Sequence, residues 1–162
     1  MKKIVKKILI LYLISLIIIP NASLAETQVD LFVVPDYSSY LDPDYLILDI
    51  LTNNNEEIYN TISIRIKYPQ EKLIIDSINY ENSFCEIMVN EKIDNEKGIL
   101  NISCGNTEPE SATTTNLFRI NFNKIESGWA EISLNSSEIL AHDGLGTNII
   151  GSTEDHNFYI YK

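Results

Sequence analysis

The sequence predicts an all-β fold, an antiparallel β-sandwich of about nine strands, and three observations support this class. Apolar and polar residues alternate in short runs from residue 29 onward. A period of two places one face of each strand in a core and leaves the other face more exposed. Turn-forming residues separate these runs at intervals of roughly 8 to 15 residues, which is typical of sandwiches. No stretch after residue 25 shows the period of about 3.6 residues that an amphipathic helix requires.

The first strands are marked by their bounding turns. Val29–Val34 ends at Pro35-Asp36, and Tyr45–Thr52 follows Asp42-Pro43-Asp44, and such residues favour turns over strands. Ile62–Tyr68 alternates most clearly, with Ile at every second position and Tyr68 at its end. Leu73–Tyr80 follows after Pro69-Gln70.

The later strands are predicted in the same way. Cys85–Asn90 and Ile99–Cys104 flank a polar turn. Leu117–Asn123 places two Phe and one Ile on one face, and Ala130–Leu134 follows Ser127-Gly128. Near the C-terminus, Phe158–Tyr161 alternates again. These runs complete the sandwich without a repeat or a second domain.

Residues 1–25 predict a secretory signal peptide. Four Lys precede the apolar run Ile8–Ile19, and Ser23-Leu24-Ala25 offers small residues at a cleavage site. A retained anchor is the alternative, but this run spans only about 18 Å as a helix, short of the ~30 Å hydrocarbon core. We therefore expect a secreted domain of residues 26–162 with no membrane span after cleavage.

The mature domain is strongly acidic. Cleavage leaves 137 residues, enough for one domain with a sizeable core. It also removes four of the 12 basic residues, so 8 Lys and Arg face 23 Asp and Glu. Such a chain repels nucleic acid and anionic lipid, and we expect neither as a partner. The charge is compatible with a cation or a basic partner, or with solubility alone.

The two cysteines predict a disulfide. Cys85 and Cys104 are the only cysteines, and a secreted protein folds in an oxidising compartment. If the hairpin between them is centred on Asp94-Asn95, the two cysteines lie directly opposite each other, within reach of a bridge. Two free buried thiols are the alternative.

The sequence contains few of the motifs that indicate a catalytic site. His142 and His156 are the only histidines, and neither belongs to an HxH or HExxH pair. No GxSxG nucleophile motif occurs. We expect a domain that is not an enzyme and needs no cofactor.

Aromatic residues offer a candidate glycan site. Tyr37 and Tyr40 lie in the polar segment PDYSSYLDPDY, and Trp129 points away from the face of Ala130 and Ile132. Exposed Tyr and Trp rings can stack on sugar rings. The alternatives are a Pro-bearing loop whose tyrosines cover the edge of the core, and a Trp packed on a neighbouring strand.

The segment Glu138–Ile150, EILAHDGLGTNII, offers a weak candidate calcium site. Asp143, Asn148 and a nearby carbonyl could hold the ion, which needs about six to eight oxygens. The segment lacks the EF-hand pattern, and a Gly-dependent turn before the last strand is the alternative.

The chain resembles the cohesin domain family on three stretches. Val29–Val34 with Tyr45–Thr52 is similar to the family's opening pair, and TISIRIKYPQEKL (Thr61–Leu73) is similar to its third strand. Asn116–Ile149 resembles the closing section. The resemblance differs in two places, because the Asp-Pro common after the Tyr is Pro69-Gln70 here and the cysteine pair is unusual.

The resemblance implies a jelly-roll β-sandwich and a function in binding. Cohesins of cellulosomes grip a dockerin module through one sheet face, and Ser63, Arg65 and Lys67 of the third strand would lie on that face. We therefore expect a secreted, non-catalytic module that docks an extracellular protein. The alternative is a carbohydrate-binding module that recognises cell-surface polysaccharide through Tyr37, Tyr40 and Trp129.

Overall fold

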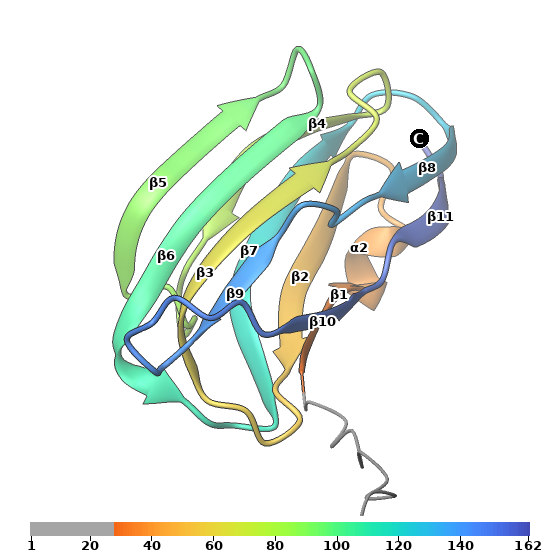
Figure 1. The fold of residues 1–162 in the computed structure, drawn as a ribbon. Helices are drawn as coiled ribbons and strands as arrows, with labels where there is room; N and C mark the ends of the chain where they lie inside the picture. The colour runs from red at the N-terminus through yellow and green to blue at the C-terminus, as the bar shows by residue number, and fades with distance from the viewer. Residues whose placement is uncertain (1–27) are drawn as a thin grey trace, which may run out of the picture.

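Two stacked β-sheets form the protein (Figure 1). The computed structural model describes residues 28–162, so the predicted signal peptide lies outside the described residues. The all-β, antiparallel sandwich is confirmed, with jelly-roll topology, and strands are the dominant element of the described chain. Within these residues, no helix has the length and apolar character needed to cross a membrane.

The first sheet has five strands. Their spatial order is β10 (Ile150–Thr153), β1 (Val29–Pro35), β2 (Tyr45–Asn53), β7 (Thr114–Lys124) and β4 (Leu73–Asn79). All neighbours pair antiparallel except β1 and β10, which are parallel. The chain thus returns near its end, in β10, to lie beside its first described strand.

The second sheet has four strands and carries a two-stranded ribbon at one end. Its order is β5 (Ile87–Asp94), β6 (Ile99–Glu110), β3 (Tyr59–Lys67) and β9 (Glu138–Ala141). The ribbon consists of β8 (Gly128–Ile132) and β11 (His156–Ile160). Backbone hydrogen bonds between Lys67 and Ser133 join the end of β3 to the chain that leaves β8.

The predicted alternation is confirmed by burial. Ile62, Ile64 and Ile66 are buried, and so are the inward residues of β7, β8 and β11. Phe118 and Phe122 of β7 are among the largest buried side chains. Burial of a large apolar side chain contributes about 1.5–3 kcal/mol, so these alternating strands account for most of the favourable burial energy.

All nine predicted strands are present, but the described chain has eleven. The two additional strands, β9 and β10, have four residues each, too few to show a period of two. Both lie at the ends of the segment expected to form only a turn before the last strand. That segment instead crosses from the second sheet to the first.

One short helix, α2 (Tyr37–Tyr40), was not predicted from the sequence. Asp36 caps its N-terminus and accepts hydrogen bonds from the backbone N–H of Ser38 at 2.9 Å and from its hydroxyl at 2.6 Å. The Lys124 side chain extends from β7, and its buried ammonium donates hydrogen bonds to the carbonyls of Ser39, Tyr40 and Asp42. A helix of one turn is too short to show a period of about 3.6 residues, so the sequence pattern did not reveal it.

The disulfide is confirmed, but the register expected to produce it is wrong. Cys85 and Cys104 are bonded, with Cα atoms 5.2 Å apart. Yet Cys104 lies opposite Met88, and Asp94 lies opposite Ile99. The hairpin is centred two residues further along the chain, and Cys85 reaches Cys104 from just before β5.

The turn itself explains this shift. Gly98 adopts φ +62°, and a Cβ there would lie 2.0 Å from the carbonyl oxygen of Tyr68. The Asn95 side chain bonds to the Tyr68 hydroxyl at 2.7 Å and to the backbone N–H and carbonyl of Ile75 at 2.9 and 3.1 Å. Asn95 is therefore held against β4 at the start of the turn, and the turn closes at Gly98.

Candidate functional site

The outer face of the four-stranded sheet is the first candidate site, and we call it the sheet face. The pairing register places the outward side chains of β3 beside those of its neighbours. The face is lined by Ser63, Arg65 and Lys67 of β3, Ser103 and Asn101 of β6, Asn90 and Lys92 of β5, and Glu138 of β9. Figure 1 shows these four strands side by side.

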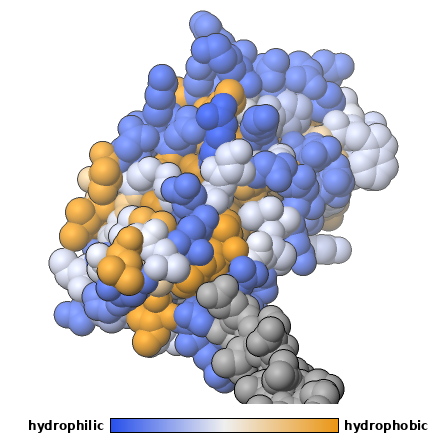
Figure 2. Space-filling model, viewed as in Figure 1, coloured by the Kyte–Doolittle hydropathy of each residue, from blue (hydrophilic) through white to orange (hydrophobic). Residues whose placement is uncertain are grey.

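The sheet face is polar at its centre and apolar along one edge. The hydroxyls of Ser63 and Ser103 are 3.0 Å apart, and the Ser137 hydroxyl accepts from the backbone N–H of Arg65 at 3.2 Å. Ile87 and Val89 of β5 are both exposed, and Figure 2 shows apolar atoms gathered at this edge. A flat surface with a polar centre and an apolar margin offers both hydrogen bonds and apolar contacts to a large partner.

The sheet face carries three basic side chains beside the carboxylate of Glu138. Arg65, Lys67 and Lys92 are three of the 8 basic residues after residue 25, and their side chains all project from this sheet. None of the four ion pairs within residues 28–162 includes them. In a chain with 23 acidic residues, cations outside these ion pairs can attract an acidic surface.

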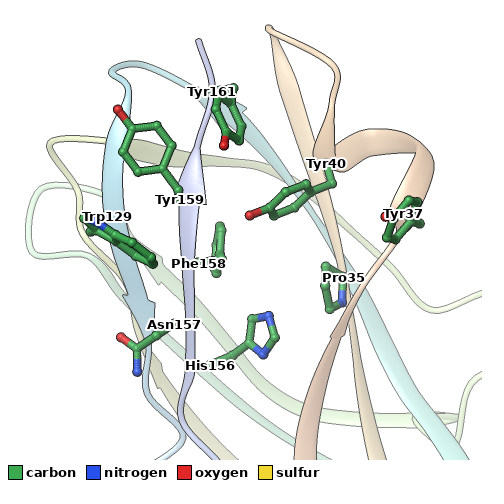
Figure 3. Close-up of a pocket in the computed structure, with 9 residues that line it drawn as sticks. All are labelled: Pro35, Tyr37, Tyr40, Trp129, His156, Asn157, Phe158, Tyr159 and Tyr161. Carbon is green, nitrogen blue, oxygen red and sulfur yellow. The ribbon is translucent and has the colours of Figure 1, made fainter.

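An aromatic hollow is the second candidate site, with a volume of about 690 Å³. Its nine lining residues come from β1, α2, β8 and the C-terminal strand: Pro35, Tyr37, Tyr40, Trp129, His156, Asn157, Phe158, Tyr159 and Tyr161. Figure 3 shows Trp129 and Tyr159 on one side of β11, Pro35 and Tyr37 on the other, and Phe158 and His156 between them. The elements that line the hollow, α2, β8 and β11, lie on the flank of the molecule away from β5 (Figure 1).

Strand pairing and helix capping build the hollow. Trp129 lies directly opposite Tyr159 in the β8–β11 ribbon, with ring centroids 5.8 Å apart and planes at 90°. Tyr40 of α2 makes an edge contact with Tyr161 at 6.3 Å and a tilted contact with Phe158 at 6.2 Å. Phe158 is buried and forms the floor, whereas Tyr37 and Trp129 are 85% and 72% exposed.

Comparison with solved structures identifies the fold. A cohesin module from a family 33 glycoside hydrolase of Clostridium perfringens superposes with a TM-score of 0.66 at 13% identity, over 83% of this chain and 98% of that one. A non-cellulosomal cohesin from the archaeon Archaeoglobus fulgidus matches with a TM-score of 0.63 at 13% identity, over 83% and 92%. The chain has a cohesin fold.

A cohesin in complex with a dockerin from Clostridium thermocellum superposes equally well. Its TM-score is 0.65 at 10% identity, over 87% of this chain and 98% of that one. No protein-family model and no curated protein sequence matches the chain. At these identities the likeness concerns the fold, and the predicted sites stand on their own geometry.

The structure brings together some predicted site residues of this cohesin fold and separates others. Tyr37, Tyr40 and Trp129, which lie up to 92 positions apart, meet in the aromatic hollow. Ser63 and Arg65 project from the sheet face, and Lys67 lies at its end. The two predicted sites are therefore distinct surfaces.

Asp143 and Asn148 lie in the loop between β9 and β10, and the turn uses their oxygens. The Asp143 carboxylate accepts from the backbone N–H of Leu145 at 2.8 Å and from the hydroxyl of Thr147. These hydrogen bonds lower the pKa of Asp143. Asn148 accepts from the N–H groups of Ile139 and Ile150. Calcium binding here stays a prediction, and no group of three His, Cys, Asp or Glu in residues 28–162 is arranged to hold a metal.

Sequence reasoning missed the C-terminal half of the hollow. His156, Asn157, Tyr159 and Tyr161 were visible only as residues near or within the last strand. The signal was the alternation itself, because Tyr159 and Tyr161 point away from Phe158 and Ile160. Pairing that strand with the one that carries Trp129 would have placed them together.

Proposed function

We propose that this domain is a secreted, non-catalytic module that docks an extracellular protein through the sheet face. The observation that carries the proposal is the group of unpaired cations, Arg65, Lys67 and Lys92, on a flat exposed sheet of an acidic chain. Charge of one sign on a docking surface speeds association with a partner of opposite sign and disfavours other partners. The partner surface is therefore acidic, with an apolar contact for Ile87 and Val89.

The solved structures with this fold support a dockerin-like partner. They include complexes of a cohesin with a dockerin from Clostridium thermocellum and Acetivibrio cellulolyticus. The disulfide between Cys85 and Cys104 is consistent with secretion, because such bonds persist in oxidising compartments. The predicted signal peptide points to the same location.

A capture experiment with matched variants tests the docking proposal. The mature domain is immobilised and exposed to the envelope and culture-fluid proteins of the organism that makes it, and bound proteins are identified by mass spectrometry. We expect Arg65→Glu to lose a partner that the parent retains. Lys162→Glu makes the same charge change away from the sheet face and should retain it. Equal capture by both variants, or no specific partner, would contradict docking through the sheet face.

We propose polysaccharide binding as a second candidate function, because one observation favours it specifically. Three aromatic residues that the sequence singled out for sugar stacking converge in one hollow, and four more aromatic or imidazole rings line it. A glycan array probed with the mature domain tests this function. Binding to at least one polysaccharide is the expected result, and a blank array would contradict it.

A further inference from the structure

The aromatic hollow combines ring faces with polar groups that have no partner in the protein. The hydroxyls of Tyr59, Tyr68 and Tyr80 are each hydrogen-bonded within the protein, to Thr52, Asn95 and Glu91. By contrast, the described residues offer no hydrogen-bond partner to the hydroxyls of the four hollow tyrosines, Tyr37, Tyr40, Tyr159 and Tyr161. These hydroxyls remain available to a ligand rich in hydroxyl groups of its own.

The lining of the hollow carries no carboxylate, ammonium or guanidinium group. The rest of the domain is strongly acidic, with 23 Asp and Glu in the whole chain. An anionic ligand would find no ammonium or guanidinium group to pair with and would be repelled by the surrounding field. A neutral ligand with apolar faces meets neither penalty.

The rings that line the hollow do not lie in one plane. Trp129 and Tyr159 are perpendicular, Tyr40 and Tyr161 meet at 76°, and Tyr159 and Tyr161 meet at 55°. A flat crystalline surface requires coplanar rings to stack against, whereas inclined walls enclose a ligand that enters the hollow. The volume of about 690 Å³ lies within the ~300–1,000 Å³ typical of small-ligand sites.

The hollow is held in shape before any ligand arrives. The Lys124 ammonium fixes the end of α2 through three carbonyls, and the Ser39 hydroxyl, which donates to Asp36 at 2.9 Å, accepts from the N–H of Ile47 at 2.8 Å. The β8–β11 ribbon fixes Trp129 and Tyr159 by its register. Little backbone ordering is then needed on binding, which favours affinity.

We infer that the aromatic hollow binds the sugar rings of a neutral, soluble polysaccharide chain, with ring stacking on Trp129 and Tyr40 and hydrogen bonds to the hollow tyrosines. This inference rests on the second candidate function, polysaccharide binding, and adds its location and the class of glycan. The lining elements α2, β8 and β11 lie on the flank away from β5 (Figure 1). A glycan seated there leaves the sheet face free for a protein partner.

The test uses isothermal titration and affinity electrophoresis with four soluble neutral polysaccharides (β-glucan, xylan, mannan and α-glucan). Polygalacturonate, microcrystalline cellulose and a proline-rich peptide are the comparison ligands. We expect at least one neutral polysaccharide to bind and the three comparison ligands to fail. Trp129→Ala should weaken binding by about tenfold or more, because a stacking ring is lost. Tyr40→Phe, which keeps the ring, should weaken it less.

Tyr45→Ala is the matched control, since Tyr45 is an exposed tyrosine outside the hollow. It should bind as the parent does, and circular dichroism should show all variants folded. Binding of polygalacturonate or cellulose, lost in Trp129→Ala, would overturn the neutral, soluble class and leave polysaccharide binding intact. Glycan binding unchanged in Trp129→Ala and Tyr40→Ala would overturn the location alone. Binding of the proline-rich peptide only, or of no ligand, would overturn the inference together with the second candidate function.

Discussion

Removal of the disulfide should lower the free energy of unfolding by an amount set by the length of the chain loop that the bridge closes. The bridge joins Cys85 and Cys104, which are 19 positions apart. In the chain-entropy model, a loop of this length restricts the unfolded chain by about 11 cal/mol/K, or about 3 kcal/mol at 25 °C. At about 2.1 cal/mol/K of unfolding entropy per residue, the 135 described residues translate this loss into a Tm lower by about 11 °C.

Thermal and urea unfolding would measure this loss in three samples. The oxidised parent is compared with the reduced parent, which keeps both sulfur atoms, and with the variant Cys85→Ala/Cys104→Ala. We expect reduction to lower the free energy of unfolding by about 3 kcal/mol, and the double variant to lose somewhat more because Cys104 is fully buried. Reductant should leave the double variant unchanged. A reduced parent within about 1 kcal/mol of the oxidised one would refute the entropic argument.

Three further predictions concern single side chains. Lys124→Met leaves three carbonyls without their donor and should cost about 3 kcal/mol in urea unfolding, and unchanged stability would contradict its role as the anchor of α2. Asn95→Ala removes three hydrogen bonds at the β5–β6 turn and should cost about 2–4 kcal/mol; an Asn95→Ala protein as stable as the parent would show that the turn does not need them. In the folded state the pKa of Asp30 lies below its ordinary value of 3.8, and the hydrogen bond from the Ser152 hydroxyl is the largest cause. The stability that this hydrogen bond contributes is therefore fully present above pH 3.8 and is lost as pH falls through the folded pKa. The stability difference between the parent and Ser152→Ala should therefore be larger at pH 6 than at pH 2.5, and an equal difference at both would contradict the assignment.

The strands could be predicted because their pattern is local. Ile62 to Ile66 and Phe118 to Phe122 bury alternate side chains on strands of nine and eleven residues, long enough for a period of two to emerge. β9 and β10 have four residues each, and β10 is fixed by parallel pairing with the distant β1. Alternation within a short segment does not show which distant strand that segment pairs with.

The sites were predictable to different degrees for the same reason. Ser63 and Arg65 follow from the alternation within one strand, so their outward position could be read directly. The hollow depends on the contact of Tyr40 with Tyr161 and on that of Trp129 with Tyr159, which are set by the tertiary packing of α2, β8 and the C-terminal strand. The sequence showed the right residue types, and only the fold showed that they share one cavity.

The register of the β5–β6 hairpin shows how a correct result can follow from a wrong step. Opposition of the cysteines was inferred from a turn centred on Asp94-Asn95. In the structure Asn95 is held against β4 and Gly98 closes the turn. The bridge forms because Cys85 precedes β5 and can still reach Cys104. Contacts between the sheets, which a hairpin considered alone does not contain, decide the register.

The most direct test of docking through the sheet face is to map the contact surface of the captured partner. Amide chemical shifts of the ¹⁵N-labelled domain would be followed while the purified partner is titrated in. Docking through the sheet face predicts that the largest changes fall on β3, β5, β6 and β9, centred on Ser63, Arg65 and Ser103. Changes centred on the five-stranded sheet, or on α2, β8 and β11, would contradict it.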